Sequence, residues 1–301
     1  MTKQSGILVV DKPAGITSAG VVARVKKIFG ARKVGHAGTL DPFATGILVC
    51  CINRGTKLAR FFLHGNKKYE AVLHLGIETD TQDSTGTVTS ICDNVLFSEI
   101  KIRSVFKRFE GTIEQMPPVY SALKFKGTPL YKLARRGKPV QKPARRVTIF
   151  NIEILEINLP LIRFEVACSA GTYIRTLCAD IGTLLGFGGH LKELRRIENS
   201  GFTIEEAATL SELEELARSD KLSRRTISMA NALRDMPGHL ADNVLAEKIV
   251  HGNILTRKDV APIQTDSPEG FIKVVDAEND LLAILNYTKY SSRYKYHCVF
   301  N

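Results

Sequence analysis

The sequence predicts an α+β protein that is built around a largely antiparallel sheet and carries a small C-terminal β-barrel module. Two apolar-alternating segments, Val147–Asn158 and Leu161–Cys168, read as the arms of a hairpin. Strand-like and helical runs follow one another without regular βαβ repeats, which is typical of an α+β domain. The 301 residues, 44% of them apolar, suffice for one large domain and a small second one.

The N-terminal segment predicts a strand, a turn and a helix in that order. Gly6–Val10 is typical of a short buried strand, and the turn-prone segment Asp11–Gly15 comes after it. Apolar residues at helical spacing then predict a helix that is capped by Thr17 or Ser18 and ended by Gly30.

The middle of the chain adds the remaining elements of the predicted sheet. Gly46–Ile52 and Tyr69–Leu75 are expected to be strands, because the first is continuously apolar and the second alternates. The hairpin comes next along the chain. Behind it, Ile174–Leu185 has the apolar spacing of an amphipathic helix that Gly186 closes.

Beyond Gly201 the pattern changes. Residues 203–218 form an acidic helical stretch, and Met236-Pro-Gly238 separates it from the C-terminal segment. We therefore expect one domain over residues 1–236 and a second over residues 237–301. The short elements expected in the second are a helix at Ala241–Val250 and strands at Phe271–Val275, Leu281–Leu285 and Tyr294–Phe300, which together suggest a small barrel.

The charge distribution indicates an anionic partner. The chain holds 42 Lys and Arg residues against 31 Asp and Glu residues. Residues 117–147 hold nine basic side chains and no acidic one, whereas residues 76–116 are net acidic. A solvated surface would mix the signs, so segregated positive stretches favour a nucleic acid. Charge alone does not separate RNA from DNA or from an anionic lipid surface.

Several common kinds of site are absent from the sequence. It has no phosphate-binding, dinucleotide-binding, zinc-protease or hydrolase-elbow motif, and its seven histidines and six cysteines show no metal-ligand or disulfide spacing. We therefore expect no metal. No apolar run could span a bilayer, and residues 1–5 lack the apolar stretch of a signal peptide. We expect a cytoplasmic protein with reduced thiols.

The most informative segment is Lys33–Gly46, which is too polar and too rich in glycine to be core. It presents one histidine, His36, and one carboxylate, Asp41, in a basic neighbourhood. Asp41 can be a simple turn residue before Pro42. Alternatively, the glycines permit a ligand to approach the backbone, and nearby cations keep a carboxylate ionised, so that Asp41 acts as a base or nucleophile.

This segment and five others resemble the motifs of the TruB pseudouridine synthases, which make pseudouridine at position 55 of tRNA. The resemblance rests on Gly35-His-Ala-Gly-Thr-Leu-Asp-Pro-x-Ala-Thr-Gly46, Asp11-Lys-Pro-x-Gly-x-Thr-Ser18, Lys68-Tyr-x-Ala71, Cys168-Ser-x-Gly-Thr-Tyr-Ile-Arg-Thr-Leu177, His190-Leu-x-x-Leu-Arg-Arg196 and Pro117-Pro-x-Tyr-Ser-Ala-x-Lys124. One departure is Ala170, where many relatives carry lysine, and it would weaken a phosphate contact. The resemblance implies the pseudouridine-synthase fold and a PUA-like C-terminal domain.

The resemblance also implies an isomerase chemistry. The family's reaction breaks the N1–C1′ bond of uridine, rotates the base and joins C5 to C1′, so it needs no cofactor. The essential ionised aspartate is similar in position to Asp41, its ion-pair partner to Arg175, and the tyrosine that stacks on uracil and assists proton transfer at C5 to Tyr69. Whether Asp41 attacks the base, attacks C1′ or deprotonates C2′ stays open.

Five further residues gain substrate-binding roles from the resemblance. Tyr173 and Leu194 are expected to line the uracil pocket, and His36 is expected to fill the space that the flipped base leaves in the T-loop. Lys12 and Pro13 are expected to support the loop of the aspartate, with a phosphate contact as a second role for Lys12. Tyr173 and Leu194 are also compatible with ordinary core positions, and His36 with an ordinary loop histidine.

The implied partner is tRNA, bound by a monomer without an obligate protein partner or a membrane. Base flipping costs a few kcal/mol of stacking, and contacts elsewhere on the RNA must offset it. The acid-free insertion at about residues 117–147 suits that task, and we expect it to be a lid that orders on the T stem-loop. The basic stretch Tyr287–Tyr296 either contacts the acceptor stem or is an ordinary strand with basic edges.

Two alternatives stay open. The chain could be a non-catalytic tRNA-binding protein or folding chaperone, with Asp41 only a turn residue. It could also be a related pseudouridine synthase that acts on another RNA within a larger complex, although it lacks the long basic extensions that we associate with such relatives.

Overall fold

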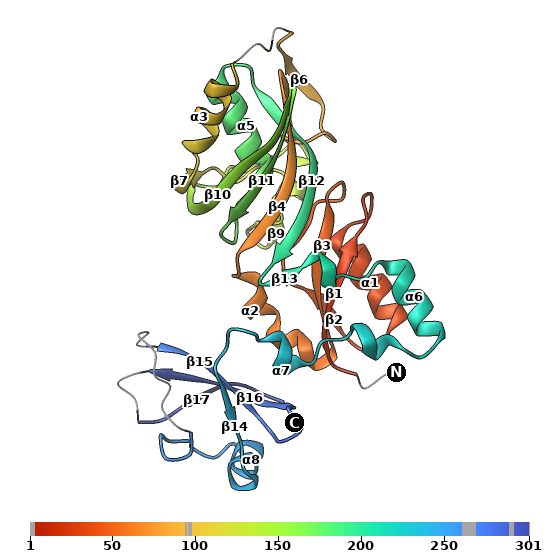
Figure 1. Cartoon of the computed structure of the whole chain (residues 1–301), viewed down its shortest axis with the longest axis vertical. Coiled ribbons are helices and arrows are strands. Elements are labelled where there is room, and N and C mark those ends of the chain that lie inside the picture. The colour runs from red at the N-terminus through yellow and green to blue at the C-terminus, as the bar shows by residue number, and fades with distance from the viewer. Residues whose placement is uncertain (1–3, 94, 96–97, 261–268, 289–291, 301) are drawn as a thin grey trace.

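A computed structural model describes residues 4–93, 95, 98–260, 269–288 and 292–300, and a nine-stranded sheet is the frame of its larger part (Figure 1). From edge to edge the strands are β1 (Gly6–Lys12), β3 (Thr45–Ile52), β12 (Gly189–Asn199), β4 (Lys67–Leu75), β11 (Leu161–Cys168), β10 (Arg145–Asn158) and β7 (Gly111–Gln115), with β2 (Val34–His36) beside β3 and β13 (Phe202–Thr203) beside β12. All neighbouring pairs are antiparallel except β3 and β12, so the predicted α+β class with a largely antiparallel sheet is confirmed.

The strands β1 and β3 are buried on both faces, which explains their continuously apolar sequences. Leu8 and Val10 point to one side, where α1 (Ser18–Ile28) and α6 (Leu210–Arg218) cover them. Ile7 and Val9 point to the other side. The helix α1 begins as predicted, with the Thr17 hydroxyl accepting a hydrogen bond from the Gly20 backbone N–H at 2.9 Å.

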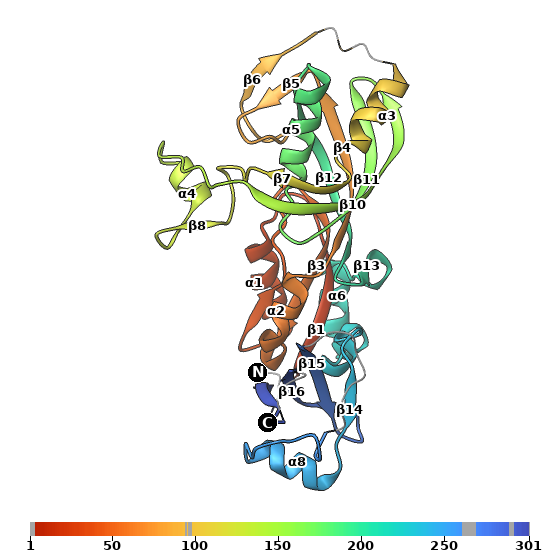
Figure 2. The same ribbon diagram turned by 90° about the vertical axis from the view of Figure 1, so that its left-hand side faces the viewer.

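A second core lies between the sheet and two helices, α3 (Glu99–Lys107) and α5 (Ile174–Leu185) (Figures 1 and 2). The predicted hairpin forms β10 and β11 and contributes alternate side chains to this core. Tyr69, Ala71 and Leu73 of β4 point to the same side. Helix α5 ends as predicted, with Gly186 in the left-handed conformation.

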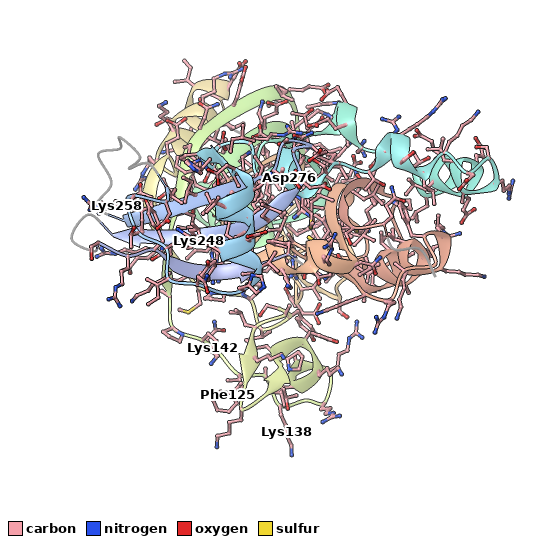
Figure 3. All side chains as sticks on the ribbon, turned by 90° about the horizontal axis from the view of Figure 1, so that it is seen from below. Phe125, Lys138, Lys142, Lys248, Lys258 and Asp276 are labelled. Atoms are coloured by element: carbon pink, nitrogen blue, oxygen red, sulfur yellow. The ribbon has the colours of Figure 1, made fainter. Side chains whose placement is uncertain are left out.

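The insertion between β7 and β10 projects from the body of the molecule, as Figure 2 shows. It contains the short strands β8 (Lys124–Phe125) and β9 (Thr128–Pro129) and the helix α4 (Leu130–Ala134). Its side chains Phe125, Lys138 and Lys142 extend away from the rest of the chain (Figure 3). The basic segment singled out by composition is therefore a separate arm.

The C-terminal part is a four-stranded sheet of β14 (Gly238–Leu240), β15 (Glu269–Val275), β16 (Leu281–Thr288) and β17 (Lys295–Val299), accompanied by α8 (Asn243–Val250). In the described residues this sheet is open, with β14 and β17 at its edges, so the predicted closed barrel is not observed. Side chains of this sheet share an apolar cluster with α2 (Ala59–Leu63), α7 (Met229–Ala232) and β1. Lys289, part of the predicted tyrosine-rich stretch, lies outside the described residues.

Some elements differ from the sequence-based expectation. The polar segment 33–46 begins with the short strand β2, which pairs with β3. Residues 203–218 form a 3-10 turn at Ile204–Glu206 before α6, rather than one helix. The central strand β12 was not predicted, because its charged residues interrupt the alternation with two bulges. The small strands β5 (Ile77–Thr79) and β6 (Val88–Ile91), and 3-10 turns at Asn53–Leu58 and Leu222–Arg225, complete the described elements.

The six cysteines are free thiols. No helix in the described part of the chain is long and apolar enough to cross a membrane.

Candidate active site

The loop that carries Asp41 is anchored to β1 and α1 by buried polar contacts. The Lys12 ammonium is fully buried and donates hydrogen bonds to the carbonyl oxygens of Pro13 at 2.8 Å and Pro42 at 3.0 Å. Ser18 exchanges two hydrogen bonds of 2.9 Å with the backbone of Leu40. These contacts fix the backbone on both sides of Asp41.

The same loop is anchored from β12 by Arg196, which is 1% exposed. Its guanidinium donates to the carbonyl oxygens of Ile47 at 2.7 Å and Gly38 at 3.0 Å. Gly46 lies at the end of the loop with φ of +96°, and a Cβ atom there would lie 2.2 Å from the Arg196 carbonyl oxygen. Only glycine therefore allows the loop to approach β12 this closely.

Asp41 forms an ion pair with Arg175 at the N-terminal end of α5. Oδ2 of Asp41 lies 3.0 Å from Nε of Arg175, whose N–H is not aligned for a hydrogen bond, so the contact is electrostatic. The Arg175 side chain is 5% exposed and the Asp41 side chain 35% exposed. The cation is thus enclosed, while the carboxylate keeps an open side.

Three further groups hold the Arg175 guanidinium. Nη1 lies 3.3 Å from a carboxylate oxygen of Asp83 and donates to the carbonyl oxygen of Thr81 at 3.0 Å. Nη2 donates to the carbonyl oxygen of Tyr120 at 2.8 Å. The guanidinium is therefore held in place by groups from two loops, independently of its ion pair with Asp41.

Burial raises the pKa of Asp41 above its ordinary value of 3.8, Arg175 and Lys12 lower it, and Asp83 raises it further. Arg175 and Lys12 therefore favour the ionised form of Asp41, as the basic neighbourhood suggests, but they only partly offset the effect of burial on its pKa. Burial also lowers the pKa of Lys12 to about 8, against the opposing effect of the Asp41 charge. This ammonium is enclosed, so a phosphate contact by Lys12 is not compatible with its position.

Tyr69 and Leu194 lie on the face of the sheet that α5 covers. Tyr69 is 8% exposed; burial raises the pKa of its hydroxyl, and the Arg196 charge opposes that rise. The Asp41 charge also acts on this pKa, which places the two side chains in one electrostatic environment. Leu194 lies beside Ala71 across β12 and β4, next to the Tyr69–Arg196 pair.

The remaining predicted residues surround this centre less closely. Tyr173 immediately precedes α5, two residues before Arg175. His36 ends β2, and burial followed by the Arg196 charge lowers its pKa, while its Nδ1 atom is buried without a hydrogen-bond partner in the described residues. Pro13 is exposed and serves through its carbonyl oxygen, which accepts from Lys12.

Comparisons with known proteins agree with this arrangement. Residues 26–174 match the model of the TruB family pseudouridylate synthase N-terminal domain, and residues 175–236 match the tRNA pseudouridylate synthase B C-terminal domain. A tRNA pseudouridine synthase B from Syntrophotalea carbinolica is 48% identical over 77% of this chain and 76% of its own. The chain belongs to the TruB family.

Two further comparisons extend the TruB likeness over most of the chain. The tRNA pseudouridine synthase B of Geobacter sulfurreducens is 43% identical over 85% of this chain and 84% of its own. A crystal structure of a Cbf5-Nop10-Gar1 complex contains a chain that is 28% identical, with a TM-score of 0.79 over 98% of this chain and 85% of that one. The pseudouridine-synthase fold implied by the sequence motifs is therefore confirmed.

In this TruB-family chain, sequence reasoning missed three residues around the ion pair. Asp83 is 3% exposed and is a second carboxylate at Arg175, but its acidic segment resembled ordinary surface. Arg196 was noted only as the end of a motif, and Gln115 was not singled out. The available signal was adjacency to motifs, since both Gln115 and Arg196 border segments that were recognised.

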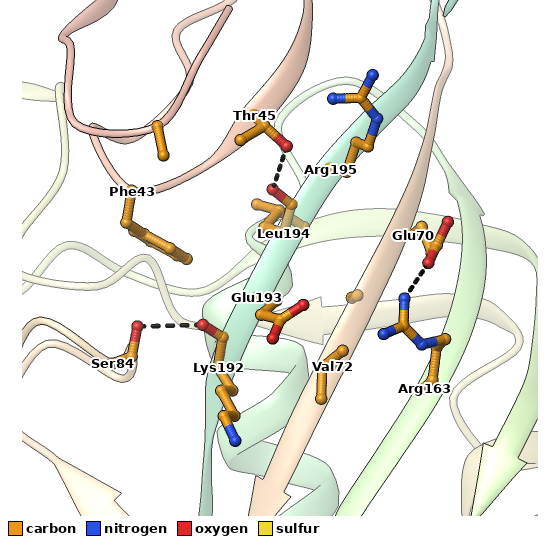
Figure 4. Close-up of a pocket in the computed structure, with 12 residues that line it drawn as sticks. Phe43, Thr45, Glu70, Val72, Ser84, Arg163, Lys192, Glu193, Leu194 and Arg195 are labelled. Carbon is orange, nitrogen blue, oxygen red and sulfur yellow. Dashed lines mark hydrogen bonds and ion pairs between the residues drawn. The ribbon is translucent and has the colours of Figure 1, made fainter.

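A hollow of about 430 Å³ lies against β4, β11 and β12, next to the chain that follows Asp41 (Figure 4). Glu70 and Val72, which alternate with Tyr69 and Ala71 along β4, contribute to its lining. Glu70 pairs there with Arg163. Phe43 and Thr45, which follow Asp41 in the chain, also line the hollow. Neither Asp41 nor Arg175 lines the hollow, but Leu194 does, together with Phe43 and Ser84, so it borders the candidate active site.

Proposed function

We propose that this chain converts uridine to pseudouridine at position 55 in the T-loop of tRNA. The observation that carries the proposal is the partly open Asp41 carboxylate paired with the enclosed Arg175 guanidinium at 3.0 Å, in a chain of the TruB family. In this role the ionised Asp41 reacts with the flipped nucleotide, and the fixed cation stabilises its charge. Tyr69 stacks on the uracil and assists the proton transfer at C5.

Base flipping assigns tasks to the surrounding residues. Tyr173 and Leu194 line the pocket for the base, and His36, whose Nδ1 lacks a partner in the described residues, fills the space that the base leaves. The arm at residues 117–147 grips the T stem-loop, which is consistent with its nine basic side chains and no acidic one. The exposed Phe125, with Lys126 and Lys142 over its ring at 5.6 and 5.1 Å, offers it a base-stacking surface.

The proposal covers the organisation of the whole chain. Residues 1–236 act as the catalytic unit, and residues 237–301 act as a PUA-like RNA-binding module that contacts the acceptor stem. The protein acts as a cytoplasmic monomer without an obligate protein partner or cofactor. Analytical ultracentrifugation of the free protein tests the monomer, and a dimer at micromolar concentration would contradict it.

The alternative of a non-catalytic tRNA chaperone required Asp41 to be only a turn residue. Its carboxylate faces Arg175 instead of capping its own turn, and this favours catalysis. The alternative of another RNA substrate has less support. The relatives named tRNA pseudouridine synthase B are 40–48% identical, whereas the chains from H/ACA and Cbf5 structures are 26–28% identical.

The test measures tritium release from tRNA labelled at C5 of uridine. We expect release by the wild-type chain, and Asp41→Asn should abolish it while tRNA affinity stays within about threefold, because the amide keeps the shape but not the charge. Asp276→Asn, in the turn between β15 and β16 (Figure 3), is the matched control and should keep full activity. Tight tRNA binding without any release by the wild type would favour the chaperone, and release only from another RNA would refute the assigned substrate.

A further inference from the structure

Gln115 holds both backbone polar groups of Tyr173. Its Oε1 atom accepts a hydrogen bond from the Tyr173 N–H at 2.7 Å, and its Nε2 atom donates one to the Tyr173 carbonyl oxygen at 3.0 Å. Gln115 is 1% exposed and is the last residue of β7. A buried amide that satisfies both groups of one residue fixes that residue in position and orientation.

Arg145 holds the same tyrosine through its ring. The guanidinium carbon lies 4.7 Å from the centre of the Tyr173 ring, within the range of a cation–π contact. The Arg145 Nη2 atom also donates to the carbonyl oxygen of Gly171, two residues earlier. Gly171 has φ of +91°, and a Cβ atom there would lie 3.3 Å from the guanidinium carbon, so glycine gives the cation room.

Gln115 and Arg145 are direct partners in the pairing of β7 with β10. The strands β8 and β9 and the helix α4 of the arm lie between them in the sequence, so Gln115 and Arg145 mark the two ends of the projecting part. A third contact joins the arm to the site, since the carbonyl oxygen of Tyr120 accepts from Arg175. Gln115 and Arg145, at the two ends of the projecting part, therefore contact Tyr173, and Tyr120 within the arm contacts Arg175.

We propose that Gln115 and Arg145 are positioning residues, which set Tyr173 and the first turn of α5 with Arg175 for uridine isomerisation and link this geometry to the RNA-gripping arm. The inference rests on the proposed function. Neither residue touches the ion pair; they act through Tyr173, whose carbonyl oxygen also accepts the first hydrogen bond of α5, from Leu177 at 3.0 Å. A displacement of about 1 Å at reacting groups can cost about 100-fold in rate.

The experiment compares Gln115→Met and Arg145→Lys with the wild-type chain in single-turnover pseudouridine formation on full-length tRNA. Gln115→Met keeps the volume and removes both hydrogen bonds, and Arg145→Lys keeps the charge but loses the planar fork. We expect single-turnover rates at least tenfold lower, with tRNA Kd changed less than threefold and Tm within a few degrees. Arg163→Lys, on the opposite face of the sheet, is the control and should behave as wild type.

Two readouts separate positioning from a general loss of structure. Hydrogen exchange of the Tyr173 amide should accelerate in Gln115→Met while amides in the middle of α5 stay protected. The acid limb of the rate profile should move to higher pH, because Arg175 would act less on Asp41; Lys12, Asp83 and Tyr69 also face this carboxylate.

Unchanged rates in both variants would overturn the inference, as would a rate loss that a matching loss of tRNA affinity explains in full. If Gln115→Met fails to fold, Arg145→Lys alone decides by the same criteria. An inactive wild-type chain would instead refute the proposed function and the inference with it. The two failures are distinguishable because only the first leaves the wild type active.

Discussion

Arg175 and Asp41 form an asymmetric ion pair, in which the cation is enclosed and the carboxylate is partly open. Two carbonyl oxygens and Asp83 hold the guanidinium, so its position does not depend on Asp41. The carboxylate lies on a loop that Lys12 and Arg196 anchor from behind. A fixed cation beside a reactive anion stabilises charge without reorganisation during the reaction.

Replacing Arg175 with lysine should therefore impair catalysis although the positive charge is retained. A lysine ammonium cannot reach Asp41, Asp83 and two carbonyl oxygens in the planar arrangement of the guanidinium. We expect the single-turnover rate to fall by about 100-fold, with tRNA affinity changed less than threefold. Arg103→Lys, at an exposed position of α3, should leave the rate unchanged, and an equal loss in both variants would contradict this role for Arg175.

The reaction should have an acid limb set by Asp41. The carboxyl must be ionised to react, and burial raises its pKa above 3.8, so the rate should fall as pH decreases through that raised pKa. Single-turnover rates between about pH 4.5 and 9, with tRNA binding measured at each pH, check this. A rate that stays level throughout would show that ionisation of Asp41 does not limit the reaction.

The same raised pKa predicts that Asp41 costs stability. The folded chain binds the Asp41 proton more tightly than the unfolded chain, so stability is present at low pH and falls as pH rises through the folded pKa. Asp41→Asn should raise Tm at pH 8 slightly, on the order of 1–2 °C, because partial exposure screens the effect. The difference should vanish near pH 4, and a lower Tm at pH 8 would contradict it.

Removing the Arg196 guanidinium should destabilise the loop and lower activity together. Arg196→Met leaves the buried carbonyl oxygens of Gly38 and Ile47 without their donor, which should cost about 2–4 kcal/mol in the free energy of unfolding. Urea unfolding gives this quantity, with Arg195→Met in the next position as the control. A cost below about 1 kcal/mol would mean that solvent or other groups replace these contacts.

The arm should account for part of the salt dependence of tRNA binding. Replacing Lys126 and Lys142 with alanine removes two cations next to Phe125, so the slope of log K against log salt should become shallower by about 1–2. Filter binding between about 50 and 300 mM salt measures the slope. Lys221→Ala, shortly after α6, is the control and should leave the slope unchanged. An unchanged slope in the Lys126 and Lys142 variant would mean that the RNA does not contact these two lysines.

Much of the fold could be predicted because local patterns matched the final burial. The alternation in β4, β10 and β11, the Thr17 cap of α1 and the Gly186 stop of α5 are properties of neighbouring residues. The strand β12 was missed for the opposite reason. An arginine in a sequence predicts an exposed position, but Arg196 of this strand is buried. Its hydrogen bonds to the carbonyl oxygens of Gly38 and Ile47, which are far away in the sequence, explain why it lies in the interior.

The candidate site shows the same division. The resemblance to the TruB motifs implied the roles of Asp41, Tyr69 and Arg175, and in the structure Asp41 pairs with Arg175 and its charge acts on the Tyr69 hydroxyl. The role of Asp83 depends on a tertiary contact with Arg175 and could not be found. Gln115 borders a recognised motif, but its role depends on tertiary contacts with Tyr173 that the motif does not show. The sequence also could not predict that the pKa of Asp41 is raised, because the extent of its burial depends on packing that a sequence does not show.

The apolar cluster shared by the C-terminal sheet with β1 and α2 has a mechanical consequence. Phe61 and Phe271 pack edge-on at 5.2 Å, and Arg60 lies over both rings, so the two parts are joined by a continuous interior. The arm and the C-terminal sheet are then held at a fixed separation, and under the proposed function a tRNA that contacts both must span it. Heating should therefore unfold both parts in a single calorimetric transition. A chain truncated after residue 236 should expose the apolar surface that the C-terminal sheet covers, and it should aggregate.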